Sequence, residues 1–211
     1  HMVAVIPKFG PESGGTWLTI YGVHFIDSGN LTCRFGQQSV SRATWISSDT
    51  MHCATPASIP GRLPVAISFN GQDHYENNLL FEFQETSSIF DVIPEMGPIT
   101  GGTLVRVLAT NIEFSATLKC RFGNIEVPAT YLNSSEVLCV TPPSMEGSVS
   151  VQITKNGADF EDSNLTFSFV AAPLILDVFP EFGWSSGGSV IMLNVSGLPL
   201  DSSNMYCSFG D

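Results

Sequence analysis

A short glycine-containing motif recurs along this chain at an almost constant interval. PESGGT at 11–16 returns as PITGGT at 98–103 and, more loosely, as WSSGGS at 184–189. The first glycine of each pair is Gly14, Gly101 or Gly187, so the steps are 87 and 86 residues. Solenoid repeats are roughly 20 to 50 residues long, so a step of this size indicates tandem whole domains.

Other landmarks keep the same step and the same order in each copy. They are Pro7, Pro94 and Pro180; CRFG at 33–36 and 120–123, with CSFG at 207–210; CATP at 53–56 and CVTP at 139–142; Asn-Gly at 70–71 and 156–157; and FEF at 81–83 with FSF at 167–169. We therefore expect domains at 3–86, 87–172 and 173–211. The last would be only the N-terminal part of a domain.

Composition and periodicity predict an all-β fold for each copy. The chain is 43% hydrophobic and 13% charged, and turn residues interrupt its short apolar runs every 8–12 residues. In WLTIYG at 17–22, Leu18 and Ile20 alternate with the outward Trp17 and Tyr21. About seven such strands per copy favour a sandwich of two sheets. The glycine pair would allow a sharp bend between the first two strands, and short linkers predict an extended rod.

The cysteines are also repeated. Cys33 and Cys53 lie 20 residues apart, and Cys120 and Cys139 lie 19 apart. One disulfide within each domain is the favoured interpretation, and buried thiols in a cytosolic protein are the alternative. Metal binding is less favoured, because each domain has two cysteines and no CxxC motif or nearby histidine cluster. The partner of Cys207 would fall near residue 226 by the same spacing, so its pairing stays open.

Four sequons indicate a secretory protein. They begin at Asn30, Asn133, Asn164 and Asn194. Strand alternation points Asn30, Asn164 and Asn194 outward and places Asn133 in a turn, so glycans would leave the cores undisturbed. We expect an extracellular or lumenal location, and no segment is long enough to span a membrane.

Taken in order, these motifs resemble the IPT/TIG family. The series is Pro-x-x-Gly-x-x-x-Gly-Gly-Thr, Cys-Arg-Phe-Gly, Cys-x-Thr-Pro, Asn-Gly and Phe-x-Phe. Such domains occur in plexins, the hepatocyte growth factor receptor and its relatives, fibrocystin-like proteins and protist surface proteins. The resemblance covers essentially the whole chain. It implies tandem immunoglobulin-like (E-set) β-sandwiches with one bonded cysteine pair per copy. Ala109 replaces a turn glycine in copy two, and Trp184 replaces the proline in copy three.

Catalysis is not expected. His24, His52 and His74 fall in different strands or loops, and no GxSxG, HExxH or P-loop pattern occurs. The acidic stretch FEDSN at 160–164 would bind calcium weakly at most, and a solvated hairpin end is favoured there. No cofactor or metal is expected.

Nucleic acid binding is not expected either. TIG-like domains of Rel-type transcription factors hold DNA with basic loops, but here 8 Lys and Arg face 20 Asp and Glu, giving a net charge of −12. The same charge disfavours heparin-like polyanions and anionic membranes.

Binding or spacing remains as the function. Trp17 and Tyr21 form an outward apolar pair suited to a partner surface, although packing under a loop or against a neighbouring domain would also explain them. Trp184 is expected to wedge the junction with copy two. The sequence thus predicts a non-catalytic extracellular stalk with protein partners. The alternatives are a carbohydrate-binding accessory module and an intracellular interaction scaffold.

Overall fold

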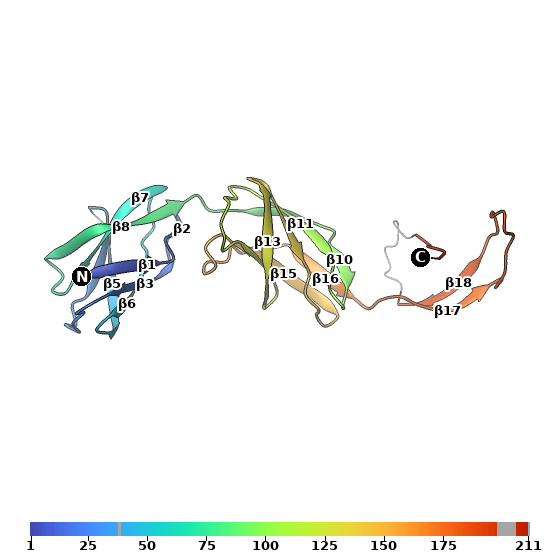
Figure 1. Ribbon diagram of the computed structural model, residues 1–211, viewed down its shortest axis with the longest axis horizontal. Helices are drawn as coiled ribbons and strands as arrows, with labels where there is room; N and C mark the ends of the chain where they lie inside the picture. The colour runs from blue at the N-terminus through green and yellow to red at the C-terminus, as the bar shows by residue number, and fades with distance from the viewer. Residues whose placement is uncertain (38, 198–205, 211) are drawn as a thin grey trace.

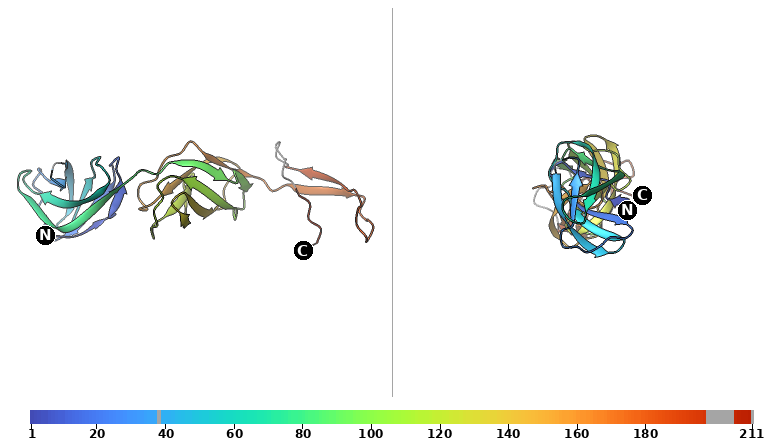
Figure 2. Two further views of the ribbon diagram at one scale, coloured as in Figure 1. Left: turned by 90° about the horizontal axis from the view of Figure 1, so that it is seen from above. Right: turned by 90° about the vertical axis from the view of Figure 1, so that its left-hand side faces the viewer.

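The chain forms an extended rod of two complete β-sandwiches followed by a two-stranded hairpin (Figure 1). The computed structural model describes residues 1–37, 39–197 and 206–210. Figure 2 shows the three bodies following one another along the long axis. Within the described residues, no helix is long and apolar enough to cross a membrane.

Each complete domain has eight strands. Domain 1 contains β1 (Met2–Ile6), β2 (Phe9–Pro11), β3 (Trp17–Gly22), β4 (Thr32–Phe35), β5 (Ser39–Ser47), β6 (Thr50–Ala54), β7 (Gly61–Ser68) and β8 (His74–Gln84). Domain 2 contains β9 (Ile89–Ile93), β10 (Met96–Pro98), β11 (Leu104–Ala109), β12 (Lys119–Phe122), β13 (Ile125–Asn133), β14 (Glu136–Val140), β15 (Gly147–Thr154) and β16 (Thr166–Val170). The hairpin consists of β17 (Leu174–Phe179) and β18 (Met192–Ser196).

The two sheets of domain 1 share a long strand. The strand order is β1-β3-β6-β5-β4-β7-β8-β2. The first half of β5 pairs with β4 and its second half pairs with β6, so β5 passes from one layer of the sandwich to the other. Domain 2 repeats this order, with β13 in the place of β5.

The predicted first strand is divided in two, which gives eight strands where the sequence suggests about seven. The chain changes sheets at Pro7, which follows a cis peptide bond: β1 pairs with β3, and β2 then runs parallel to β8. The same division occurs at Pro94 in domain 2. As a result, the short strand β2 lies at the end of domain 1 that faces domain 2 (Figure 1).

A buried disulfide and an aromatic cluster fill the middle of each sandwich. Cys33 of β4 is bonded to Cys53 of β6, and Cys120 of β12 is bonded to Cys139 of β14. The Cα–Cα distances are 6.4 and 6.3 Å, which is within the usual range for disulfides. Buried phenylalanines pack edge to face around each bond: Phe35, Phe81 and Phe83 in domain 1, and Phe122, Phe167 and Phe169 in domain 2.

The glycine pair forms the turn that the sequence predicts. Gly14 and Gly15 have φ values of 74° and 86°, in the left-handed region that favours glycine. A Cβ on Gly14 would lie 2.4 Å from the carbonyl carbon of Pro56, whereas a Cβ on Gly15 would meet nothing within 4 Å. The first glycine of the pair is therefore required both by its φ and by the neighbouring backbone.

Trp184 does not wedge the junction with domain 2, contrary to the sequence-based expectation. It belongs to the loop between β17 and β18, and this loop lies at the far end of the hairpin from domain 2 (Figure 1). Trp184 is 82% exposed. The reason is topological, because the glycine-pair turn lies at the end of each unit that faces the next unit along the chain.

Gly14→Ala is expected to destabilise domain 1 more than Gly15→Ala. The left-handed φ costs an alanine about 1–2 kcal/mol at either position, but only at Gly14 does the Cβ also collide with backbone. We expect a total loss above about 3 kcal/mol for Gly14→Ala. Urea unfolding followed by the fluorescence of Trp17 and Trp45 measures both variants, and equal losses would contradict this account.

Candidate functional site at the domain junction

Two side-chain hydrogen bonds join the turn after β15 of domain 2 to the end of domain 1. Asn156, after β15, donates from Nδ2 to the Phe9 carbonyl of β2 at 2.9 Å. Thr16 donates from Oγ1 to Oδ2 of Asp159 at 2.6 Å. We call residues 154–159 the docking turn of domain 2. The Phe9 carbonyl, which accepts a hydrogen bond, and the Thr16 hydroxyl, which donates one, together form the place on domain 1 that receives the docking turn, and we call it the acceptor site of domain 1.

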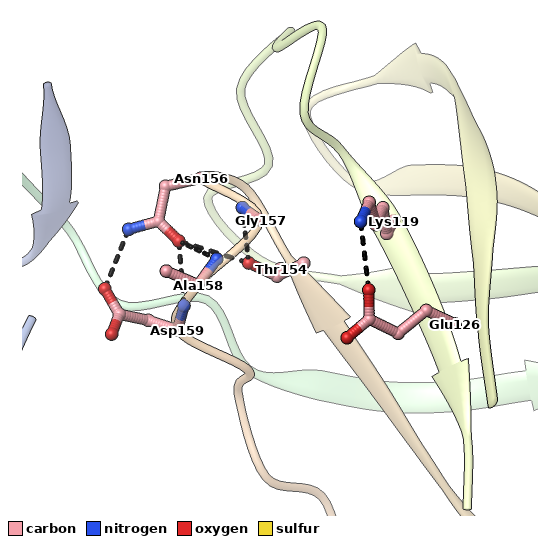
Figure 3. Close-up of polar contacts among 7 residues, drawn as sticks. All are labelled: Lys119, Glu126, Thr154, Asn156, Gly157, Ala158 and Asp159. Atoms are coloured by element: carbon pink, nitrogen blue, oxygen red, sulfur yellow. Dashed lines mark hydrogen bonds and ion pairs between the residues drawn. The ribbon is translucent and has the colours of Figure 1, made fainter. Parts of the chain in front are cut away.

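The docking turn is rigid because Asn156 organises it internally (Figure 3). Asn156 Oδ1 accepts hydrogen bonds from the backbone N–H groups of Ala158 and Asp159 at 3.0 and 2.9 Å. It also accepts one from Thr154 Oγ1 at 3.2 Å. Its Nδ2 donates to Asp159 Oδ2 at 2.7 Å, and Gly157 supplies the positive φ that the turn needs. These bonds orient Asn156 so that the second Nδ2 hydrogen reaches domain 1.

The acceptor site depends on a missing side chain in β2. A Cβ on Gly10 would lie 2.1 Å from Thr16 Oγ1, so only glycine lets the Thr16 hydroxyl lie beside β2. Thr16 is completely buried, and its backbone N–H donates to Thr55 Oγ1 at 3.1 Å. The spacing of Gly10 and Thr16 in the repeated motif is thereby explained, since together they shape the acceptor site.

A buried lysine ties the linker to domain 2. Lys155, 7% exposed, donates from Nζ to the carbonyls of Glu85 and Asn111 at 2.7 and 3.2 Å. Burial lowers the pKa of Lys155, while the surrounding carboxylates of Glu113, Glu161, Glu85 and Glu12 act in the opposite direction. This single cation thus compensates several acidic groups where the two domains meet.

Further hydrogen bonds fix the linker between β8 and β9. Gln84, the last residue of β8, donates from Nε2 to Glu113 Oε2 at 2.9 Å. Asn111 donates from Nδ2 to the Thr86 carbonyl at 3.2 Å and accepts at its own carbonyl from Ser87 Oγ at 3.2 Å. Because both flanks are bonded, the linker does not act as a free hinge.

The junction leaves no room for a small-molecule ligand. Its residual cavity is about 10 Å³, which is roughly the space of one water molecule. The cavity is lined by Phe9, Gly10, Pro11, Gln84, Lys155, Asn156, Asp159 and Glu161. The arrangement serves to join two domains.

The site residues predicted from the sequence lie away from this junction. Both predicted cysteine pairs are bonded in the structure and buried within the domain cores. Cys207 is exposed and has no disulfide partner among the described residues. All four sequon asparagines, Asn30, Asn133, Asn164 and Asn194, are exposed.

The aromatic pair lies on the outer face of domain 1. Trp17 and Tyr21 of β3 are 64% and 42% exposed, so neither lies under a loop. Trp17 meets His52 of β6 edge to face, with ring centroids 6.5 Å apart. The corresponding face of domain 2 presents Leu104, which is also exposed, in the place of Trp17.

The described residues form no cluster of the kind that binds a metal ion. No group of three or more His, Cys, Asp or Glu side chains there is placed to hold a metal ion. In the FEDSN stretch, Asp162 accepts a hydrogen bond from Gln152. Elsewhere in domain 2, Lys119 and Glu126 form an ion pair of 2.9 Å (Figure 3).

Sequence reasoning missed the residues that build the junction. The sequence marks Asn-Gly at 156–157 as a repeated landmark only and predicts no contact there with another domain. The available signal was an aspartate three residues after the asparagine, present in both copies as Asp73 and Asp159. An Asn-Gly turn does not require an aspartate at this position. The recurrence of the aspartate in both copies therefore indicates that it has a role besides forming the turn.

The fold and its junction define a tandem array of immunoglobulin-like domains. The sequence profile of the IPT/TIG domain matches residues 1–83 and 87–169, so the chain belongs to the IPT/TIG domain family. Membership identifies it as a non-catalytic module. The similarity to plexin-2 and fibrocystin-L, together with the two disulfides, identifies an extracellular or cell-surface segment of the stalk type.

Relatives are found among large surface proteins. The chain is 27% identical to plexin-2 of Caenorhabditis elegans over 206 residues, which are 91% of this chain and 11% of that protein. It is 28% identical to human fibrocystin-L over 184 residues, 85% of this chain and 4% of that protein. The chain therefore spans a small fraction of these relatives. The solved extracellular region of plexin A4 shares the fold, with a TM-score of 0.54 and 22% identity over 85% of this chain and 16% of that one.

Glu161→Gln is expected to stabilise domain 2 at neutral pH. Burial is the main cause of the raised pKa of Glu161, and it outweighs the opposing effect of Lys155. The folded state therefore holds a proton in the pH range just above 4.5 that the unfolded state has released. The contribution of this group to stability is complete below pH 4.5 and is lost as the pH rises through the folded pKa.

The variant should accordingly gain free energy of unfolding at pH 7 and gain little at pH 4, as measured by urea unfolding. Glu146→Gln is the matched control, because Glu146 is an exposed carboxylate in a loop of domain 2. An equal gain from both substitutions would attribute the effect to net charge.

Proposed function

We propose that this chain is a semi-rigid spacer within a larger extracellular protein and that it holds other domains at a set distance and orientation. The junction between domains 1 and 2 is the observation that carries this proposal. Two hydrogen bonds join the docking turn to the acceptor site, and Lys155 and Asn111 fasten the linker. A linker used only as a tether would need none of these bonds.

Thr16→Val tests the spacer function at that junction. Valine keeps the shape of threonine but leaves the half-buried Asp159 carboxylate without the hydroxyl that it accepts from. Hydrogen bonds to charged groups contribute about 1.5–3 kcal/mol, so the junction should open in a substantial fraction of molecules. Domain 1 should keep most of its own stability, because the hydrogen bond that the hydroxyl makes is to domain 2.

The measurement is the distribution of distances between two spin labels, carried by non-natural amino acids at Gln72 of domain 1 and Glu146 of domain 2. We expect one narrow distribution in the parent chain and a broad one in Thr16→Val. Thr19→Val, on the outer face of β3, should leave the distribution narrow. A broad distribution in the parent chain would refute a semi-rigid spacer.

The spacer is further proposed to carry N-linked glycans and two stable disulfides. The four sequon asparagines are exposed, so glycans would not disturb a core. The intact mass of the chain secreted from eukaryotic cells should fall on N-glycosidase treatment, and its protein part should show the loss of four hydrogens. Free thiols and unmodified asparagines would instead favour an intracellular scaffold.

A protein contact is proposed for the outer face of domain 1. Trp17, Tyr21 and Ile6 are exposed there, and single exposed aromatic anchors often dominate the energy of an interface. Carbohydrate recognition would use the same aromatic surface. A glycan-array signal that is abolished by Trp17→Ala but kept by Leu104→Ala would identify a carbohydrate ligand in place of the protein.

A further inference from the structure

Domain 1 carries the same docking turn as domain 2, at its N-terminal end. Asn70 Oδ1 accepts hydrogen bonds from the N–H groups of Gln72 and Asp73, each at 2.9 Å, and from Ser68 Oγ at 3.0 Å. Asn70 Nδ2 donates to Asp73 Oδ2 at 2.8 Å, and Gly71 has a φ of 74°. Each bond has its counterpart in the docking turn of domain 2, formed by residues 86 positions later in the chain.

The two docking turns differ in what covers them. Asn156 is 9% exposed because domain 1 lies on it, whereas Asn70 and Asp73 are both exposed. The second hydrogen of Asn70 Nδ2, which Asn156 uses to reach Phe9, has no acceptor among the described residues. The turn of domain 1 is thus preorganised for the contact that its counterpart makes.

We propose that the N-terminal end of domain 1 is a docking surface for a further IPT/TIG domain. That domain would place a strand carbonyl on Asn70 and a threonine or serine hydroxyl on Asp73, as domain 1 does for Asn156 and Asp159. The proposal rests on the observed junction and does not depend on what the spacer holds apart.

The rim of this docking surface selects the kind of domain that fits. The positions of Glu113, Lys155 and Glu161 around the docking turn of domain 2 are taken in domain 1 by Ile26, Phe69 and Tyr75. Ile26 and Tyr75 are largely exposed. Beside them is an open hollow of about 300 Å³, lined by His1, Met2, Ile67, Phe69, Tyr75, Glu76 and Asn77. The incoming domain therefore needs apolar side chains where domain 1 itself presents Gln84 and Glu85.

Domain 2 has the features of such a partner. A Cβ on its Gly97 would lie 2.2 Å from Thr103 Oγ1, which reproduces the relation of Gly10 to Thr16. Its Val170 and Ala171 occupy the positions of Gln84 and Glu85. The C-terminal end of domain 2 thus combines an acceptor site with an apolar rim. We therefore choose domain 2 as the probe for the docking surface of domain 1.

The test uses an extended chain in which a second copy of residues 87–173 directly precedes residue 1 of the full chain. This join keeps the spacing found between domains 1 and 2. We expect amide hydrogen exchange of residues 68–76 to slow by about tenfold or more relative to the original chain, because opening of the docked turn becomes limiting. Residues 154–162 of the original copy, which are covered in both chains, serve as the internal reference, and segmental isotope labelling tells them apart from the added copy.

The decisive variant is Thr103→Val in the added copy only. The substituted residue lies outside the measured segment 68–76, so the variant removes the hydroxyl without altering the docking turn of domain 1. The protection of residues 68–76 should therefore be lost. Thr100→Val in the same copy is the matched control, since Thr100 is exposed and near the same turn. Protection that is absent in the extended chain, or that survives Thr103→Val, would overturn the proposal.

A second extended chain keeps the test decisive if the added domain is unstable, which exchange in its own core strands would reveal. In it, residues 1–87 are duplicated ahead of residue 1, which keeps the spacing of the observed junction, so that the polar Gln84 and Glu85 meet Ile26 and Tyr75. We expect clear protection of residues 68–76 in the original copy, read with segmental isotope labelling, but less than with the apolar rim. The same residues of the added copy should exchange as in the original chain. Equal protection in both chains would refute the selective role of the rim, and none in either would refute docking.

Discussion

The absence of a side chain at Gly10 is the constraint on which the end-to-end architecture depends. Because β2 has no Cβ there, the Thr16 hydroxyl lies against the strand and reaches Asp159 of the next domain. The adjacent Phe9 carbonyl is left to accept from Asn156. Gly10, which is needed for packing within domain 1, therefore also makes the Phe9 carbonyl and the Thr16 hydroxyl available to domain 2. The acceptor site is thus formed by the folding of domain 1 itself.

Charge at the junction contributes specificity more than strength. The chain carries a net charge of −12, yet Lys155 is buried where the two domains meet, among carboxylates of both. Moving an ammonium group out of water is costly in free energy, and hydrogen bonds and ion pairs to its partners offset that cost only when their distances and angles are favourable. A misplaced domain would leave Lys155 buried without the carbonyls of Glu85 and Asn111. The lysine thus penalises other arrangements of the two domains, which is what a spacer of defined orientation requires.

Much of the fold could be predicted from the sequence because it is expressed in local patterns repeated at a constant step. The glycine pair, the strand alternation around Leu18 and Ile20 and the family resemblance led to the correct sandwich class. The division of the first strand at Pro7 was missed, because pairing with β8 involves residues more than 70 positions away. Trp184 is placed at the wrong end of its unit by sequence reasoning, because the sequence alone does not show which end of the unit carries the glycine-pair turn. The junction itself joins residues that are 143 and 147 positions apart in the chain. The alternation of apolar residues within a strand gives no information about contacts between residues so far apart.

The contact between the domains has a consequence for assembly. It is heterologous, since a docking turn at one end meets an acceptor site at the other, and such contacts do not close on themselves when the units follow one another along a line. If further domains dock as domain 2 does on domain 1, each such junction repeats the same two hydrogen bonds. What changes from one junction to the next is the rim: charged around Asn156 and apolar around Asn70. Shared hydrogen bonds would then make docking possible, and the rim would decide which neighbours are tolerated.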